Sequence, residues 1–249
     1  MNGFFVAGTD TDAGKTIVTA ALVRQMRMQG IDAVPMKVIQ TGGGFTHDGS
    51  PISPDFEVYC SASSFIWNGD EKKDMIPLSF CSPCSPHMAS RMEGRACDTG
   101  LVLAALKRLC AKHNLVIAEG TGGINVPLSG TITSLDLIKE MGLPIILVIR
   151  NVLGCINHAL NTIQVLRLHK IPILGAVMTE TSPSQDCDTF ILEDNPEIIR
   201  MIGDLPILAN LPFIKKAQPG TESFWSALDV YMSGIVEALL KTEAKTAID

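Results

Sequence analysis

Basic clusters and long apolar runs are both missing from this sequence of 249 residues. It has 20 Lys and Arg against 26 Asp and Glu, a formal net charge of −6, and no dense Lys/Arg run. This balance argues against a general binder of nucleic acid or of anionic membranes, because both need a basic patch. The longest apolar run covers 143–149 and ends at Arg150. A membrane span needs about 20 such residues, so we expect no membrane segment.

A targeting segment and a disulfide framework are also missing. No basic residue precedes the first apolar stretch, which is too short for a signal peptide. The 7 cysteines are odd in number and irregularly spaced, which is typical of reduced thiols in a cytoplasm. Cys81 and Cys84 have C-x-x-C spacing, but no second pair suits a zinc site and two prolines make the segment a loop. Loop packing is therefore favoured over a functional role for this pair.

The apolar residues that are present, 46% of the chain, alternate between short runs and longer amphipathic stretches. This alternation is typical of strands that alternate with helices. Runs without polar alternation predict strands that are buried on both faces, as in parallel sheets. We therefore predict one α/β domain over 1–249, with a mainly parallel sheet, helices on both faces and a frayed tail from about 241. The expected strands are 4–7, 33–36, 115–118, 143–149, 172–178 and 207–208, and the expected helices are 15–29, 99–112, 155–169 and 224–239.

The segment with the strongest chemical signal is 8–16, GTDTDAGKT, which follows one expected strand and opens a helix. Unpaired N–H groups and the dipole at a helix start attract phosphate. Gly14 allows close approach of the backbone, Lys15 supplies a charge to the β- and γ-phosphates, and Thr16 can ligate Mg²⁺. Five residues separate the two glycines instead of the usual four. We predict nucleotide binding over the alternative, a simple glycine turn, and a fold similar to the P-loop NTPases.

Three further charged residues lie near the expected strand ends. Glu119 follows the strand 115–118, Lys37 follows the strand 33–36, and Asp55 lies at the end of a glycine-rich loop. The carboxyl ends of parallel strands meet at the crevice where ligands bind. Glu119 and Asp55 could therefore hold Mg²⁺, and Lys37 could stabilise charge that develops in a transfer reaction. Taken alone, Asp55 would more often be a helix cap, and a lone lysine at a strand end, such as Lys37, is usually solvated.

Segment 153–158 offers a second helix start that could receive an anion such as a carboxylate. Without other evidence, a simple strand-to-helix turn is the favoured interpretation. His87 and His158 are expected to be structural.

Five blocks of the sequence resemble the dethiobiotin synthetase family in order and spacing. They are 8–16, 37–42, 85–87 (SPH), 119–123 (EGTGG) and 153–158. The resemblance covers roughly 3–180. It implies an ATP- and Mg²⁺-dependent closure of a cyclic urea in biotin biosynthesis, from 7,8-diaminononanoate and CO₂ by way of a phosphorylated carbamate. It also implies a homodimer whose active site lies across the interface.

The resemblance assigns roles to residues of this chain. Lys15 and Lys37 would neutralise charge on the γ-phosphate and the carbamate, and Thr16, Asp55 and Glu119 would hold the metal. Thr11 and Thr41 would lie near the diamine, and the helix start at 154–157 would bind the carboxylate of the substrate in the other subunit. The nucleotide would contact Asp12, Ala13, Gly14, Lys15, Thr16, Ile17, Asp55, Glu119, Gly120, Thr121, Gly122, Thr179, Glu180, Pro212 and Phe213, and the diamine would contact Thr11, Thr41, Gly154, Cys155, Ile156 and Asn157.

Four positions depart from the family pattern. Asp12 stands where Glu is common, Val38 where Pro is frequent, and Thr41 where the family has Ser. Thr179 and Glu180 stand where the family often has Asn and Asp. That Asn reads the adenine edge by paired hydrogen bonds, which Thr cannot copy, so we expect a loose preference for ATP over other triphosphates.

Two other classes of protein share the phosphate loop. A switch or partition ATPase would act on a protein partner or membrane, but the C-terminal residues supply no amphipathic membrane helix. An amide-forming ligase usually carries an added glutamine-hydrolysing domain, for which no chain remains.

Overall fold

The computed structural model describes residues 3–47, 51–63, 69–183, 189–215 and 218–239. The predicted tail from 241 lies outside the described residues. The N-terminal elements are β1 (Gly3–Gly8), α1 (Lys15–Met28), β2 (Ala33–Lys37), β3 (Gly44–Phe45), β4 (Pro51–Ile52), α2 (Pro54–Ser63), α3 (Gly69–Met75), α4 (Pro86–Glu93) and α5 (Thr99–Lys112). The remaining elements are β5 (Leu115–Gly123), β6 (Pro127–Ser129), β7 (Ile132–Thr133), α6 (Ser134–Met141), β8 (Ile145–Arg150), α7 (Cys155–Leu168), β9 (Ile173–Thr179), α8 (Thr189–Gly203), β10 (Ile207–Leu211) and α9 (Glu222–Met232).

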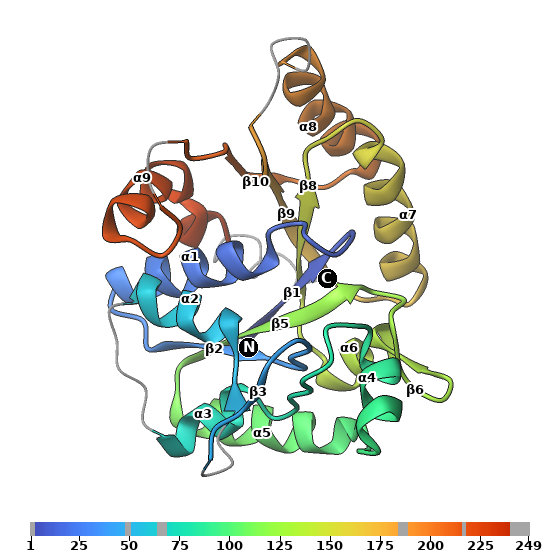
Figure 1. Cartoon of the computed structure of the whole chain (residues 1–249). Helices are drawn as coiled ribbons and strands as arrows, with labels where there is room; N and C mark the ends of the chain where they lie inside the picture. The colour runs from blue at the N-terminus through green and yellow to red at the C-terminus, as the bar shows by residue number, and fades with distance from the viewer. Residues whose placement is uncertain (1–2, 48–50, 64–68, 184–188, 216–217, 240–249) are drawn as a thin grey trace.

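A six-stranded sheet in the order β10-β9-β8-β1-β5-β2 forms the centre of the molecule. Each pairing within it is parallel, and helices cover both faces. Helices α1, α2 and α9 pack together on one face, while α5, α6 and α7 cover the other (Figure 1). Every residue of β1 and all but the last of β8 are buried, as their unbroken apolar runs predict. The predicted α/β fold is confirmed.

Three boundaries differ from the prediction in ways that matter. Strand β5 continues through Gly123, so Glu119 lies within the strand and not after it. The expected helix 224–239 is interrupted, because α9 ends at Met232 and Gly234 has a φ of 81°. The glycine-rich loop after β2 contains the short antiparallel pair β3 and β4. Pro35 fits into β2 because β2 is an edge strand of the sheet.

The buried apolar side chains form one cluster that extends over both faces of the sheet. None of the helices in the described part of the chain has the length and apolar character that a membrane crossing requires.

Candidate active site

The loop between β1 and α1 forms the phosphate-binding turn that the sequence predicts. Gly14 precedes the helix with a φ of 87°, a conformation that a side chain would strain. The bond from the Val18 N–H to the Gly14 carbonyl (3.0 Å) begins the helix. The N–H groups before Val18 therefore have no partner within the helix and can receive an anion.

Lys15 is bent back over this loop. Its Nζ donates to the carbonyl of Asp10 at 2.8 Å, and the side chain is buried. Burial lowers the pKa of Lys15, with partial compensation from the charge of Glu119. An ammonium group in this position faces the space in front of the helix start, where phosphate oxygens would neutralise it further.

Lys37, the last residue of β2, bridges two carboxylates, one in the first turn of α2 and one in β5. Its Nζ lies 2.5 Å from Oδ2 of Asp55 and 2.5 Å from Oε1 of Glu119. The register between β2 and β5 explains the contact with Glu119, because Lys37 and Glu119 lie opposite one another on these neighbouring strands. Burial acts to lower the pKa of Lys37, but Glu119 and Asp55 outweigh it and raise that pKa. Lys37 is thus held as an ammonium ion and can act by its charge, not as a base.

Asp55 belongs to this charged cluster and does not cap α2. Ser53 takes the capping position, since its Oγ accepts from the N–H of Phe56 at 3.1 Å. Asp55 is left in the first turn, free to reach Lys37. The alternative interpretations of Asp55 as a helix cap and of Lys37 as a solvated lysine are therefore wrong.

Glu119 is the most enclosed member of the cluster, with no exposed surface. Its Oε1 accepts from Oγ1 of Thr16 at 2.9 Å as well as from Lys37. Its Oε2 accepts from the hydroxyl of Tyr59. Three elements, α1, β2 and α2, therefore converge on one carboxylate.

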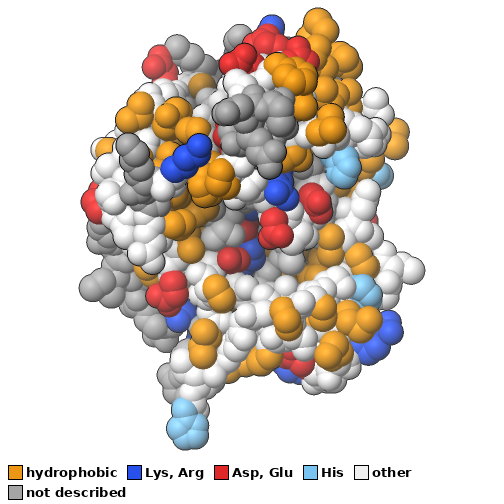
Figure 2. Space-filling model, turned by 45° about the horizontal axis from the view of Figure 1, so that its top comes forward, with side chains coloured by type: hydrophobic (Ala, Val, Ile, Leu, Met, Phe, Trp, Pro, Cys, Tyr) orange, Lys and Arg blue, Asp and Glu red, His pale blue; other side chains and the backbone are white. Residues whose placement is uncertain are grey.

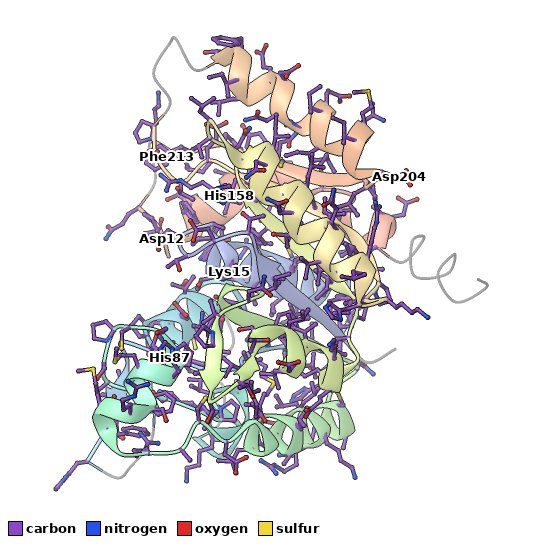
Figure 3. All side chains as sticks on the ribbon, turned by 90° about the vertical axis from the view of Figure 1, so that its right-hand side faces the viewer. Asp12, Lys15, His87, His158, Asp204 and Phe213 are labelled. Carbon is purple, nitrogen blue, oxygen red and sulfur yellow. The ribbon has the colours of Figure 1, made fainter. Side chains whose placement is uncertain are left out.

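These groups surround a polar cavity of about 480 Å³. Figure 2 shows acidic and basic side chains around a hollow on this face of the molecule. Figure 3 shows Asp12 and Lys15 between His158 above and His87 below. Among the predicted site residues, the cavity is lined by Thr11, Asp12, Gly14, Lys15, Thr16, Ile17, Lys37, Thr41, Asp55, Glu119, Thr121 and Gly122.

A second, mostly apolar cavity of about 300 Å³ adjoins the first and shares Gly14, Ile17 and Thr181 with it. Pro212 and Phe213 line it together with Phe224 and Leu228 of α9. A polar cavity at a phosphate loop joined to an apolar one suits a molecule with a charged end and a flat ring.

The remaining predicted residues lie elsewhere. Ala13 is buried beneath the loop, and Gly120 packs where a Cβ would come within 2.9 Å of the Phe5 ring. Residues 154–157 begin α7 and line neither cavity of this chain. Cys81 and Cys84 carry free thiols in the loop before α4, where loop packing was predicted.

Thr179 and Glu180 border the apolar cavity, but Thr179 has a structural bond. Its Oγ1 donates to the carbonyl of Ala13 at 2.7 Å, and the side chain is buried. A Cβ added to Gly14 would come within 3.3 Å of the Thr179 side chain. The hydroxyl of Thr179 therefore supports the phosphate loop, and its proton is already used in the bond to Ala13.

Sequence reasoning missed Tyr59, Gln40 and Thr181. Tyr59 follows Asp55 by four residues, so helical spacing could have placed both on one face. Gln40 accepts from Ser53 at 2.5 Å and donates to the carbonyl of Thr41 at 2.7 Å. Only the folded chain brings these two segments together.

Comparison with known proteins agrees with this geometry. A family model described as "AAA domain" matches residues 2–221. The ATP-dependent dethiobiotin synthetase BioD of Anaeromyxobacter dehalogenans is 40% identical over 186 residues, which cover 75% of this chain and 80% of the relative. That of Lysinibacillus sphaericus is 38% identical over 219 residues, or 85% and 92% of the two chains.

The chain belongs to the dethiobiotin synthetase family. The resemblance carried by the five sequence blocks is thereby confirmed.

Solved structures show the fold alone. The MinC:MinD cell division protein complex of Aquifex aeolicus matches with a TM-score of 0.59 at 9% identity, over 98% of this chain and 96% of that one. The Pyrococcus furiosus cell division ATPase MinD matches with a TM-score of 0.53 at 15% identity, over 100% of each chain. The P-loop NTPase-like fold is confirmed, while the sequence relatives favour the dethiobiotin synthetase family over a partition ATPase.

Proposed function

We propose that this chain closes the ureido ring of dethiobiotin from 7,8-diaminononanoate, CO₂ and ATP, with release of ADP and phosphate. Membership in the dethiobiotin synthetase family supports this reaction. The observation that carries it is the convergence of Lys15, Lys37, Asp55 and Glu119 on one polar cavity in front of a phosphate loop.

Three bond-forming steps account for the product. One amine of the diamine adds to CO₂ and loses a proton, which gives a carbamate. A carbamate oxygen then attacks the γ-phosphorus of ATP, and ADP leaves. The second amine attacks the carbamoyl carbon, phosphate leaves, and the cyclic urea closes with loss of a proton.

The chain contributes position and charge to these steps. The start of α1 and Lys15 would hold the phosphates, while the Lys37 ammonium would face the carbamate oxygen and the γ-phosphate. Thr11 and Thr41, which line the same cavity, would contact the diamine. Phosphoryl transfer depends mainly on such positioning and electrostatic stabilisation.

The residues of the cavity fit Mg²⁺. Thr16, Asp55 and Glu119 supply oxygen atoms, and both carboxylates lie on one ammonium group. No group of three or more His, Cys, Asp or Glu side chains among the described residues could hold an ion unaided. Mg²⁺ suits this arrangement, since it commonly binds one or two carboxylates together with water and substrate phosphates. When bound, it would neutralise charge on the β- and γ-phosphates.

We expect the nucleotide base to enter the apolar cavity and to be recognised weakly. Pro212 and Phe213 would pack against the ring, but the hydroxyl of Thr179 is committed to Ala13. Turnover with GTP and CTP should therefore lie within about tenfold of that with ATP, because less than about 1.4 kcal/mol of discrimination remains. Steady-state kcat/KM values for the three triphosphates measure this. A preference for ATP of several orders of magnitude would contradict it.

The start of α7 would bind the carboxylate of a substrate held by a partner subunit. Residues 154–157 line neither cavity of their own chain, and Leu153 just before them is 82% exposed, which supports a role at an interface. Asn157→Asp places a negative charge there and should raise the KM for the diamine by at least about tenfold through like-charge repulsion. Gln164→Glu, two turns further along the exposed side of α7, is the matched control, because Asn161 is bonded to Asn157 itself.

Mixing two impaired variants tests whether the site crosses the interface. Mixed dimers of Lys37→Ala and Asn157→Asp would contain one site with both native halves, so we expect activity to return at low diamine concentration. A fully active monomer, or no recovery after verified subunit exchange, would contradict a shared site.

Phosphate release with MgATP and bicarbonate, measured with and without the diamine, tests the function. We expect release to depend on the diamine. ATP hydrolysis that is indifferent to the diamine would favour the switch-type ATPase and a protein partner.

A further inference from the structure

Helix α2 directs two side chains at the candidate site, one turn apart. Asp55 reaches Lys37, and Tyr59 reaches Glu119. Side chains four residues apart lie on the same face of a helix. The position of α2 therefore sets the geometry of both carboxylates in the cluster.

Tyr59 and Glu119 meet where both side chains are buried, and Glu119 also lines the polar cavity. The hydroxyl of Tyr59 donates to Oε2 of Glu119, the oxygen that points away from Thr16 and Lys37. Each of the two carboxylate oxygens thus has its own donors. This division fixes the plane of the carboxylate and directs Oε1 toward the phosphate loop.

We propose that Tyr59 is a positioning residue that holds Glu119 in the orientation needed to bind the metal–nucleotide complex. This inference rests on the proposed function, because it takes Glu119 and Thr16 as the residues that meet the metal. Partners that orient a ligating group typically change metal affinity by about 10–100-fold when they are removed. Tyr59 lines neither cavity and would act through Glu119.

The anchoring of α2 supports this role. Ser53 caps its start. Near its end, Nη1 of Arg24 donates to the carbonyl of Ala62 at 3.0 Å, and the indole N–H of Trp225 donates to Ser61 at 3.2 Å. An ionised carboxylate can only accept, so the phenol of Tyr59 is the donor in its bond to Glu119.

Tyr59→Phe tests the proposal by removing only the hydroxyl. We expect the Mg²⁺ concentration that gives half-maximal ADP binding to rise about 10–100-fold, while ADP binding without metal stays unchanged. Saturating Mg²⁺ should restore most of kcat. Tyr231→Phe is the matched control, because Tyr231 is the other tyrosine of the chain and is 46% exposed on α9.

A purely structural role would give a different result. Tyr59→Phe would then lower the thermal midpoint and leave the Mg²⁺ dependence of a folded sample as in the unmodified chain, which would overturn the proposal. Failure of the unmodified chain to bind Mg²⁺ and ADP together would overturn the proposed site as well. The two failures are thus distinguishable.

The unmodified chain offers a second measurement that does not depend on the variant folding. Protein labelled with ¹³C at the tyrosine ring carbon that bears the hydroxyl has only two such carbons, and Tyr231→Phe assigns them. We expect the Tyr59 signal to shift when Mg²⁺ is added to the ADP-bound protein, while the Tyr231 signal stays in place. A Tyr59 chemical shift that does not change when Mg²⁺ is added would overturn the proposal.

Discussion

Replacing Lys37 with Ala should lower kcat by about 100-fold or more, because a preorganised charge that meets the transition state is commonly worth this much. The Lys37 ammonium lies 2.5 Å from both Asp55 and Glu119, in the cavity in front of the phosphate loop. Its pKa is raised by these partners despite burial. The group is therefore charged at neutral pH, as its proposed role in stabilising the transferring phosphoryl group requires.

Loss of folding could imitate this result, since the variant leaves two neighbouring carboxylates without their shared cation. Removing one partner of a fully buried pair costs about 3–5 kcal/mol. The cost here should be smaller because Asp55 is partly exposed and the cavity admits water. Circular dichroism and MgADP binding measure whether the variant is folded, and Lys107→Ala, at an exposed position of α5, is the control. A folded Lys37→Ala protein that keeps turnover within tenfold would remove Lys37 from the mechanism.

Thr16→Val should weaken the binding of MgADP by about 100-fold, because in the proposed site Thr16 would be a direct metal ligand and not only an outer partner. The substitution preserves the shape of the side chain and deletes the hydroxyl that donates to Glu119 at 2.9 Å. Isothermal titration with ADP, in the presence and absence of Mg²⁺, separates the metal contribution from the contacts of the loop.

Thr16→Ser is the matched variant for this experiment. It keeps the hydroxyl and should bind MgADP nearly as the unmodified chain does. Equal MgADP affinity in Thr16→Val and the unmodified chain would place the metal elsewhere in the cavity.

The parts of the site that follow directly from strand ends could be predicted from the sequence. Lys37 and Glu119 were expected near one another because parallel strands deliver their carboxyl ends to one edge, and the register between β2 and β5 brings them together. The phosphate loop likewise follows from the local order of strand, glycines, lysine and helix. The strands and the phosphate loop follow from short-range patterns, and the general rule for parallel sheets supplies the long-range contact between Lys37 and Glu119.

Tyr59 and Thr179 show where sequence reasoning stops. Each makes its decisive bond with a residue far away in the chain, Tyr59 with Glu119 and Thr179 with Ala13. No local pattern encodes the direction of a buried hydroxyl. The short helices α3 and α4 were missed for a related reason, since 7 and 8 residues give little room for a periodic apolar stripe.

In the proposed reaction, ATP phosphorylates a carbamate that this chain then converts into a cyclic urea. Turnover with MgATP, the diamine and ¹⁸O-labelled CO₂, begun before the label exchanges with water, tests it by mass spectrometry. We predict that dethiobiotin and phosphate form one-for-one and that each phosphate carries one ¹⁸O atom, transferred from the carbamate. Phosphate without the label, released with no dethiobiotin, would mean that water attacks ATP directly and would contradict the account.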